Sequence, residues 1–199
     1  MVEVIAFGEN PSHILSLLRS MIDDVRILVY PEFFDSKRLL LNRNYRAYIC
    51  RLIEQRDRII VAVWPDYYHS LLPRALEHIV FVYPLHSIRE LDFVLKVSDH
   101  FDIMLGFPNK PELRDYTLES FLDAARTYGF RTWLLGLKRR FTKHLHNFYG
   151  TDVTPSSCGL YKQVLNGKVK EYIGFARKLL YKTMDNMTRV LDLFCTGEG

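Results

Sequence analysis

Runs of apolar residues that end in an aromatic residue and a strand-breaking residue recur along the chain. The clearest covers residues 59–70, IIVAVWPDYYHS, where five apolar residues precede Trp64 and Pro65. A continuous apolar run predicts a strand buried on both faces. Proline has no N–H for a sheet ladder, so the strand ends there. The segment therefore predicts a buried strand, a polar loop that begins at Asp66, and then a helix.

Four other segments follow the same order. They are residues 2–10 (VEVIAFGEN), 25–35 (VRILVYPEFFD), 79–87 (IVFVYPLHS) and 103–110 (IMLGFPNK). Two shorter strands are predicted at residues 132–135 and 151–154. Apolar positions at helical spacing predict helices after the strands, including segments at residues 36–54, 71–77 and 142–149 and a long amphipathic helix at 169–194. A capping box from Ser87 to Glu90 begins another helix, and Thr117 and Gly129 bound a further one.

About seven strands alternating with helices indicate an α/β protein with a parallel sheet. The helical segments are too few and too short for two full covering layers. We therefore predict a small or incomplete TIM-type (β/α) barrel of seven to eight parallel strands, forming one domain over residues 1–199 and closed by the 169–194 helix. An open doubly wound parallel sheet is the alternative. Neither G-x-G-x-x-G nor a Walker sequence occurs, and we expect no cofactor.

Composition limits the class of protein further. No apolar run approaches the roughly 18–20 residues needed to cross a bilayer, and the N-terminus has no signal-peptide pattern. Cys50, Cys158 and Cys195 are far apart and form no C-x-x-C pair, which argues against disulfides and a zinc site. We expect a cytoplasmic protein without a metal or a membrane partner. The presence of only two glutamines favours a thermophilic source.

The charge is distributed unevenly. Residues 131–199 hold 12 of the 27 Lys and Arg residues but only 5 of the 23 Asp and Glu residues. Within this part, LKRRFTKHLH at residues 137–146 concentrates Lys138, Arg139, Arg140 and Lys143 beside Phe141, directly after a predicted strand. Such a cluster suits contacts with nucleic-acid phosphates, with the aromatic ring available for stacking. A plain solvated surface is the alternative, and the oligomeric state stays open.

Polar residues that follow the strands are the candidate site, because ligands bind at the carboxyl ends of strands in both architectures. We predict Asp66 and Asp152 as catalytic acids, since carboxylates crowded in a pocket suit acid–base work. Asp35 and His69 are interpreted as ordinary helix-start residues. The predicted ligand-binding side chains are Glu9, Glu32, Trp64, Tyr67, His86 and Asn109.

A family resemblance adds to this picture. PELRDYTLESFLDAARTYGFRTWLLGL, from residue 111, resembles part of the barrel of tRNA-guanine transglycosylases, and GTDVTPSS at residues 150–157 is similar to the family's Gly-x-Asp region. The resemblance implies that Asp152 is the acid that attacks the ribose anomeric carbon. It also implies that Gly136 and Leu137 offer backbone groups to the bound base. The family's second aspartate is replaced here by Thr154 and Pro155.

Three functions follow from these patterns. The first is a barrel that binds a nucleobase or nucleoside, in RNA or free, and cleaves or exchanges the base at an N-glycosidic bond. The second is a non-catalytic module for nucleic acid or protein on the same barrel, which the missing second aspartate favours. The third is an unrelated hydrolase that uses Glu32 and Asp66 as a carboxylate pair.

Overall fold

A computed structural model describes residues 2–155 and 159–181 of the chain. Its sheet contains eight strands, and every pairing between neighbouring strands is parallel. The strands are β1 (Val4–Phe7), β2 (Ile27–Val29), β3 (Phe33–Phe34), β4 (Val61–Val63), β5 (Val80–Pro84), β6 (Ile103–Pro108), β7 (Arg131–Leu135) and β8 (Gly150–Val153). Their order in the sheet is β2-β1-β8-β7-β6-β5-β4-β3.

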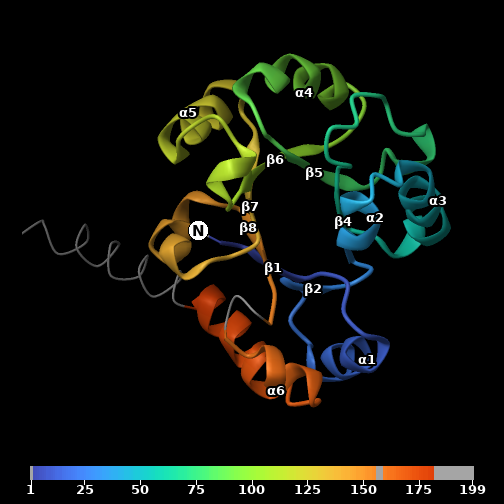
Figure 1. Ribbon diagram of the computed structural model, residues 1–199, viewed down its shortest axis with the longest axis vertical. Coiled ribbons are helices and arrows are strands. Elements are labelled where there is room, and N and C mark those ends of the chain that lie inside the picture. The colour runs from blue at the N-terminus through green and yellow to red at the C-terminus, as the bar shows by residue number, and fades with distance from the viewer. Residues whose placement is uncertain (1, 156–158, 182–199) are drawn as a thin grey trace, which may run out of the picture.

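The two ends of this sheet are consecutive in the chain. β2 pairs with β1 and β3 pairs with β4, while only residues 30–32 separate β2 from β3. The carbonyl of Glu32 accepts hydrogen bonds from the backbone N–H groups of Ile60 and Val61, both at 2.9 Å. β2 and β3 are therefore two halves of one interrupted strand, and the sheet curves into a nearly closed barrel (Figure 1). The predicted TIM-type barrel is confirmed, and the open sheet is wrong.

Helices surround the ring of strands (Figure 1). The α-helices are α1 (Ser12–Met21), α2 (Lys37–Leu41), α3 (Tyr45–Gln55), α4 (Leu91–Ser98), α5 (Leu118–Tyr128) and α6 (Tyr161–Leu165), and residues 170–181 are also helical. The 3₁₀ helices are η1 (Arg56–Arg58), η2 (Arg74–Leu76), η3 (Ile88–Glu90), η4 (Pro111–Leu113) and η5 (Arg139–Asn147). Residues 182–194 of the predicted C-terminal helix lie outside the described residues.

Local capping signals in the sequence are confirmed. Ser87 and Glu90 form the capping box, Thr117 accepts a hydrogen bond from the N–H of Ser120, and Gly129 ends α5 in the left-handed conformation. The single helix predicted over residues 36–54 is wrong. Asn44 accepts a hydrogen bond from the N–H of Ala47, so its side chain starts a second helix within the apolar pattern.

Two other predicted helices are 3₁₀ turns. Within residues 71–77 only η2 forms, because Pro73 favours an extended conformation at the residue before it and removes a backbone donor. Residues 142–147 of the second segment belong to η5, whose inward side chains Phe141 and Leu145 are buried, and residues 148 and 149 lie beyond its end. Both segments still cover the barrel, but with less helix than the apolar spacing predicted.

Side chains fill the barrel interior. The rings of Phe33 on β3 and Trp133 on β7 are stacked, with centroids 5.2 Å apart and planes 8° apart. These strands are not neighbours in the sheet, so the contact runs across the interior. Gly150 makes room for this stack, because a Cβ there would lie 2.2 Å from the Trp133 ring. The interior is therefore a packed core, and any ligand site lies at an end of the barrel.

Three buried tyrosines fix the carboxyl ends of the strands. The hydroxyl of Tyr48 donates to the carbonyl of Val63 at 2.6 Å, and that of Tyr172 donates to the carbonyl of Val153 at 2.7 Å. The hydroxyl of Tyr116 donates in the same way to the carbonyl of Leu85. Each bond satisfies a carbonyl in the last residue of a strand or directly after it. The covering elements thereby hold this end of the barrel in place.

Candidate functional site

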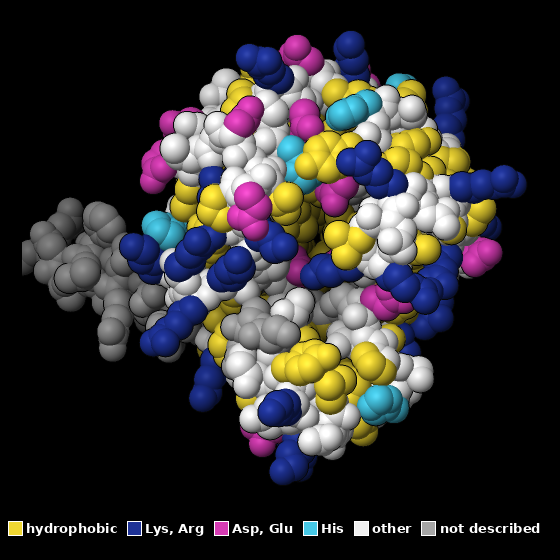
Figure 2. All heavy atoms as spheres, viewed as in Figure 1, with side chains coloured by type: hydrophobic (Ala, Val, Ile, Leu, Met, Phe, Trp, Pro, Cys, Tyr) yellow, Lys and Arg dark blue, Asp and Glu magenta, His cyan; other side chains and the backbone are white. Residues whose placement is uncertain are grey.

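A hollow of about 320 Å³ lies at the carboxyl ends of the strands, and we call it the mouth. Figure 2 shows a hollow near the centre of this face, with both acidic and basic side chains around its border. The polar and charged residues that line the mouth are Asp35, Lys37, Asp66, His86, Asn109, Lys110 and Asp152. Both predicted catalytic acids, Asp66 and Asp152, therefore lie in one cavity.

Asp152 stands near the end of β8 and is only 3% exposed. Its Oδ1 atom accepts hydrogen bonds from the backbone N–H of Gly136 at 2.8 Å and from the indole N–H of Trp133 at 3.4 Å. The N–H of Leu137 donates to the backbone carbonyl of Asp152 at 2.9 Å. The carboxylate is thus held in a fixed orientation at the floor of the mouth.

Asp35 and Lys37 complete the polar centre of the mouth. Lys37 Nζ lies 3.5 Å from Asp35 Oδ2 and 3.9 Å from Asp152 Oδ2. Burial raises the pKa of Asp35 to about 6, although the Lys37 ammonium opposes this shift; the nearby Asp152 carboxylate adds to it. Burial lowers the pKa of Lys37, but the two carboxylates outweigh it and the pKa is raised. Asp35 can therefore carry or release a proton near neutral pH.

Glu32 is not part of the mouth, and this prediction is wrong. The sequence placed the strand end at Tyr30-Pro31, but the chain re-enters the sheet at β3 and leaves it at Asp35. Glu32 is exposed, its carboxylate accepts a hydrogen bond from the N–H of Val29 at 3.0 Å, and it lines a separate hollow with Arg19. Asp35 takes the position that sequence reasoning gave to Glu32. The two phenylalanines at positions 33 and 34 were the feature of the sequence that could have indicated a further strand ending at Asp35.

Asp66 and His86 form an ion pair on the wall of the mouth. His86 Nε2 lies 3.2 Å from Asp66 Oδ1, and His86 Nδ1 lies 2.8 Å from the carbonyl oxygen of Leu113. Burial lowers the pKa of His86, but hydrogen bonds to these two acceptors outweigh it and the pKa is raised. Both ring nitrogens face acceptors, which favours the doubly protonated imidazolium.

The backbone groups predicted to meet a ligand have other partners. The N–H groups of Gly136 and Leu137 both bond Asp152, and the carbonyl of Gly136 accepts a hydrogen bond from the Asn109 amide. The N–H groups of Gly136 and Leu137 therefore position Asp152, and the binding of a base by the backbone of these residues stays a prediction. Asn109 lies in the mouth as predicted, and its side-chain oxygen has no hydrogen-bond partner within residues 2–155 and 159–181.

Glu9 borders a second hollow of about 310 Å³, which shares Asp35, Lys37 and Asp152 with the mouth. The Glu9 carboxylate accepts a hydrogen bond from Ser36 Oγ at 2.8 Å and lies 3.7 Å from the Arg51 guanidinium. This placement agrees with the predicted position of Glu9 at the carboxyl end of the first strand. Its contacts with Ser36 and Arg51 leave its carboxylate beside the mouth rather than inside it.

The two aromatic residues predicted beside the mouth differ in their surroundings. Trp64 is completely buried and packs edge-on against Phe81 and Phe101, so its placement in a ligand-binding wall is wrong. A strand buried on both faces gives no alternation that would have indicated which way this ring points. Tyr67 is 47% exposed, and its ring stacks on that of His86.

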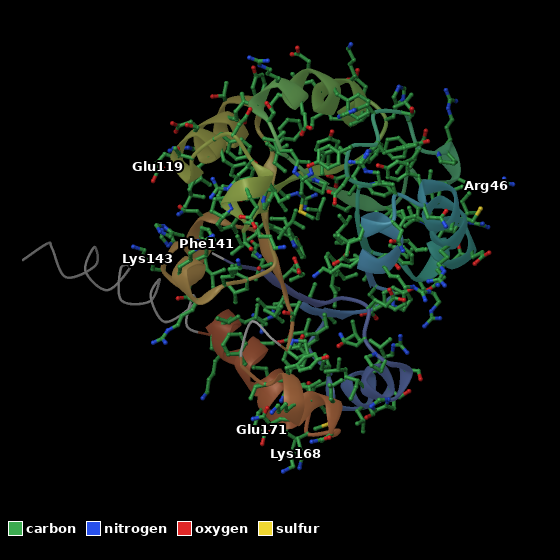
Figure 3. All side chains as sticks on the ribbon, in the orientation of Figure 1. Arg46, Glu119, Phe141, Lys143, Lys168 and Glu171 are labelled. Atoms are coloured by element: carbon green, nitrogen blue, oxygen red, sulfur yellow. The ribbon has the colours of Figure 1, made fainter. Side chains whose placement is uncertain are left out.

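The predicted basic cluster lies along η5, beside the mouth. Lys138, Arg139, Arg140 and Lys143 are all exposed. Figure 3 shows Lys143 with Phe141 on this segment, at one side of the ring of strands. Phe141 is buried against Phe107, with ring centroids 5.6 Å apart, so the predicted stacking role of Phe141 is wrong. Arg140 donates a hydrogen bond to the backbone carbonyl of Asn109, which ties the cluster to the mouth.

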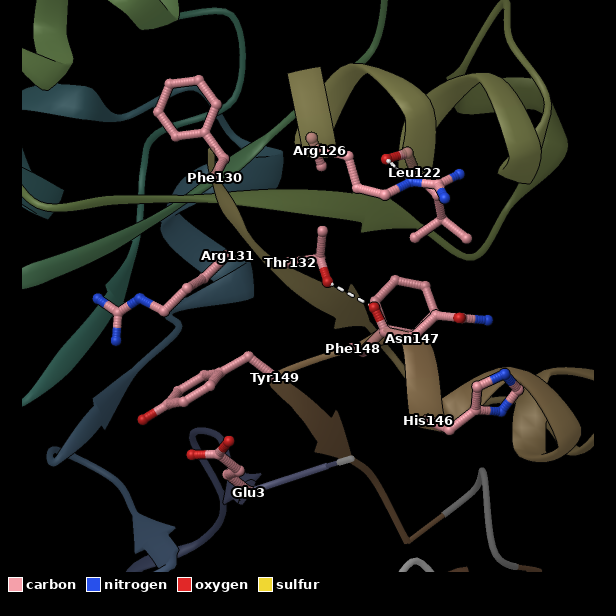
Figure 4. Close-up of a pocket in the computed structure, with 11 residues that line it drawn as sticks. Glu3, Leu122, Arg126, Phe130, Arg131, Thr132, His146, Asn147, Phe148 and Tyr149 are labelled. Atoms are coloured by element: carbon pink, nitrogen blue, oxygen red, sulfur yellow. Dashed lines mark hydrogen bonds between the residues drawn. The ribbon is translucent and has the colours of Figure 1, made fainter. Parts of the chain in front are cut away.

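Another hollow, of about 350 Å³, lies at the amino ends of β7 and β8 (Figure 4). Arg131, Tyr149 and Glu3 line it, and Thr132 Oγ1 donates to the carbonyl of Asn147 at 2.8 Å. None of the predicted site residues lines this hollow. In barrels of this kind the amino end serves stability and the carboxyl end carries the active site. The mouth is therefore the candidate functional site.

The part of the chain that the structure describes contains no cluster of three or more His, Cys, Asp or Glu side chains suited to a metal ion. Cys50 is exposed and forms no disulfide with any residue that the structure describes. Among the described residues, no helix is both long enough and apolar enough to span a bilayer.

Fold and site together define a parallel (β/α) barrel with a pocket at the carboxyl ends of its strands, lined by three aspartates and by basic side chains. Comparison with known proteins finds no matching family model and no matching solved structure. The chain is 34% identical over 190 residues to an uncharacterized protein, ORF192, of Acidianus two-tailed virus, an alignment covering 89% of this chain and 95% of ORF192. The chain belongs to the same family as ORF192.

Proposed function

We propose that the mouth binds a nucleobase or nucleoside and that the protein cleaves or exchanges the base at an N-glycosidic bond. One observation carries the proposal: two buried carboxyl groups, Asp35 and Asp152, flank the same Lys37 ammonium in a cavity of about 320 Å³. Because of these two contacts, the facing carboxyl oxygens are less than about 8 Å apart.

A separation within this limit is compatible with cleavage of a glycosidic bond. Enzymes that cleave sugar bonds hold two carboxyl groups about 5–5.5 Å apart when one attacks the sugar and about 6.5–9.5 Å apart when a water attacks. Asp35, with a pKa of about 6, would protonate the leaving base, and Asp152 would attack or stabilise the positive anomeric carbon. The resemblance to tRNA-guanine transglycosylases supports the role given to Asp152.

The part of the mouth lined by Asp66 and His86 would hold the base. Asp66 can accept hydrogen bonds from ring N–H groups, and its ion pair with His86 fixes its carboxylate. Lys138, directly before η5, and Arg139 and Lys143 on η5 would contact phosphates if the base belongs to an RNA. This arrangement divides the recognition of sugar, base and phosphate among three parts of the rim.

The test is release or exchange of a base from nucleosides and short RNA oligonucleotides, followed by chromatography between pH 5 and 8. The wild-type protein should release or exchange a base, and Asp35→Asn and Asp152→Asn should each lose the activity. Asp123→Asn, on the exposed surface of α5, serves as the control and should keep it. Absence of both nucleoside binding and base release in the wild-type protein would refute the proposal.

A non-catalytic binding module on the same barrel is the second candidate. It is favoured by Thr154 and Pro155 at the positions of the missing aspartate and by the Lys37 ammonium, which faces both carboxylates. Tight nucleoside binding without turnover would identify it. The third interpretation, a hydrolase that pairs Glu32 with Asp66, has less support, because Glu32 and Asp66 line separate hollows.

A further inference from the structure

Arg43, Tyr67 and His86 form a stack at the rim of the mouth. The Tyr67 ring and the His86 imidazole are parallel, with centroids 4.3 Å apart and planes 14° apart. The guanidinium carbon of Arg43 lies 5.8 Å from the centroid of the Tyr67 ring. His86 lines the mouth, while Tyr67 is 47% exposed beside it. The stack therefore extends from the pocket wall to the open surface.

The backbone of this stack is held in an uncommon conformation. Arg43 has φ 50° and Tyr67 has φ 59°, and they are the two non-glycine residues with positive φ in residues 2–155 and 159–181. Left-handed backbone is unfavourable for such side chains and concentrates at ligand-binding sites. Arg43 lies between α2 and α3, whereas Tyr67 follows β4, so two separate loops supply the two strained residues to one place.

The surrounding contacts fix both loops. The hydroxyl of Tyr45, two residues after Arg43, donates to the carbonyl of Asp66 at 2.8 Å. The rings of Tyr45 and Tyr68 also pack together, with centroids 5.3 Å apart. Asp66 in turn pairs with His86. The exposed aromatic ring is thus presented on a rigid base that is continuous with the predicted base-binding wall.

From this geometry we infer that Tyr67 and Arg43 bind the nucleotide next to the one in the mouth, so that the ligand is single-stranded nucleic acid rather than a free nucleoside. The inference rests on the proposed function of the mouth. The His86 imidazole covers one face of the Tyr67 ring, and a base would stack on the other face, from which the Arg43 guanidinium, 5.8 Å from the ring centroid, would move aside. A guanidinium can stack on the same base or donate hydrogen bonds to its phosphate. Tyr67 and Arg43, which we call the platform, therefore add affinity for nucleic acid without recognising a particular base sequence.

The basic cluster on η5 lies elsewhere on the rim and lacks an exposed aromatic ring, since Phe141 is buried. A strand that enters the mouth would have its phosphates at η5 and a neighbouring base at Tyr67. A free nucleoside reaches only the mouth, so the platform affects the two kinds of ligand differently. This difference allows an experiment to separate the platform from the pocket.

The test compares the affinity of a nucleoside with that of a six-nucleotide single-stranded RNA containing it, by calorimetry and fluorescence anisotropy. Tyr67→Asn and Arg43→Asn are the variants, because asparagine tolerates positive φ and preserves the loops. Each should weaken RNA binding about tenfold and leave nucleoside affinity unchanged. Tyr67→Phe keeps the ring and should bind RNA like the wild type.

Matched controls remove equivalent groups elsewhere. Tyr128→Asn, on α5, removes a tyrosine that is 48% exposed, against 47% for Tyr67. Arg46→Asn removes an exposed arginine on the outer side of α3 (Figure 3). Both controls should bind RNA and nucleoside like the wild type, and melting temperatures verify that every variant is folded.

The two proposals fail in different ways. If the wild type binds the nucleoside but binds RNA no more tightly, or if Tyr67→Asn weakens both ligands equally, the platform is wrong and the pocket stands. If the wild type binds neither ligand, the proposed function of the mouth is wrong and the platform falls with it. A tenfold loss of affinity for RNA in Tyr67→Asn, with unchanged affinity for the nucleoside, supports both the platform and the proposed function of the mouth.

Discussion

The carboxylate of Asp152 on β8 accepts a hydrogen bond from the backbone N–H of Gly136, which directly follows β7, at 2.8 Å. A second bond, from the N–H of Leu137 to the carbonyl of Asp152, runs beside it at 2.9 Å. The loop after one strand is therefore tied to the predicted catalytic acid on the next. This relationship makes Asp152 both a candidate for chemistry and a partner that the fold requires.

Two substitutions at Asp152 separate these roles. Asp152→Asn keeps an oxygen that can accept from Gly136, so we expect the free energy of unfolding to change by less than about 1 kcal/mol. Asp152→Ala leaves the N–H groups of Gly136 and Trp133 without this acceptor and should lower it by about 1–3 kcal/mol. Both variants should lose base release. Urea unfolding measures the difference, and an equal loss of stability in both variants would contradict this assignment.

Gly136 permits the Asp152 contact because it adopts φ +69°, which places its N–H toward the carboxylate. A Cβ atom there would lie 2.5 Å from the Asn109 amide nitrogen. We expect Gly136→Ala to lower the free energy of unfolding by about 2 kcal/mol or more, from backbone strain and this clash.

Gly129→Ala is the matched control for Gly136→Ala. Gly129 has φ +72°, but a Cβ there would meet nothing within 4 Å. This substitution should show the backbone effect alone, about 1 kcal/mol. Equal destabilisation of the two variants in urea would show that the contact with Asn109 contributes nothing.

The barrel could be predicted from sequence because its strands are continuous apolar runs with clear breakers, as in residues 59–65. The position of the acids was harder to predict. The Tyr30-Pro31 break looks like the end of a strand, yet Phe33 and Phe34 resume the sheet and move the strand end to Asp35. Strands buried on both faces also carry no alternation. Sequence therefore gave no sign that Trp64 points into the core.

Contacts that depend on tertiary packing could not be predicted from the sequence either. Lys37 matters because it meets Asp35 and Asp152, and the second of these is distant in the chain. Likewise, the meeting of Arg43 with Tyr67 depends on how two loops dock. The split between α2 and α3, which creates the Arg43 loop, was hidden by an unbroken helical pattern.

Asp35 makes stability depend on pH. Its pKa rises from 3.8 in a solvated chain to about 6 in the folded protein, because burial disfavours the charged carboxylate. The favourable contribution of protonated Asp35 to the free energy of unfolding is therefore complete below pH 3.8 and is lost as the pH rises through 6. The asparagine in Asp35→Asn cannot titrate. The free energy of unfolding of this variant should therefore exceed that of the wild type increasingly between pH 4 and 6, by a difference that reaches on the order of 3 kcal/mol. Urea unfolding at pH 4 and 7.5 measures it; a gain independent of pH would contradict it.

The His86 imidazole should report on Asp66. The raised pKa of His86 means that their interaction stabilises the fold fully below pH 6.5 and is lost as the pH rises through the folded-state pKa. In Asp66→Asn the hydrogen bond from His86 to a carboxylate, which is the main effect raising the His86 pKa, is lost, while burial still lowers that pKa. We therefore expect an NMR titration of the His86 ring to show a lower pKa in Asp66→Asn than in the wild type. An unchanged pKa would mean that Leu113 alone maintains the imidazolium.

The last prediction concerns the positively charged side chains on η5 and depends on the proposed binding of RNA. Each phosphate contact contributes about −0.7 to the slope of log affinity against log salt for single strands, because bound cations release counterions. Arg139→Ala combined with Lys143→Ala should therefore make the slope less negative by about 1.4. Arg140 is kept, since it also bonds the backbone at Asn109.

The matched control combines Arg46→Ala with Lys168→Ala, which removes the same charge at sites away from η5 (Figure 3). Its salt slope should match that of the wild type, because only cations that touch phosphate release counterions. Anisotropy titrations of a labelled single-stranded RNA at several salt concentrations give all three slopes. If both double variants shift the slope equally, net charge explains the binding and η5 has no specific place on the path of the strand.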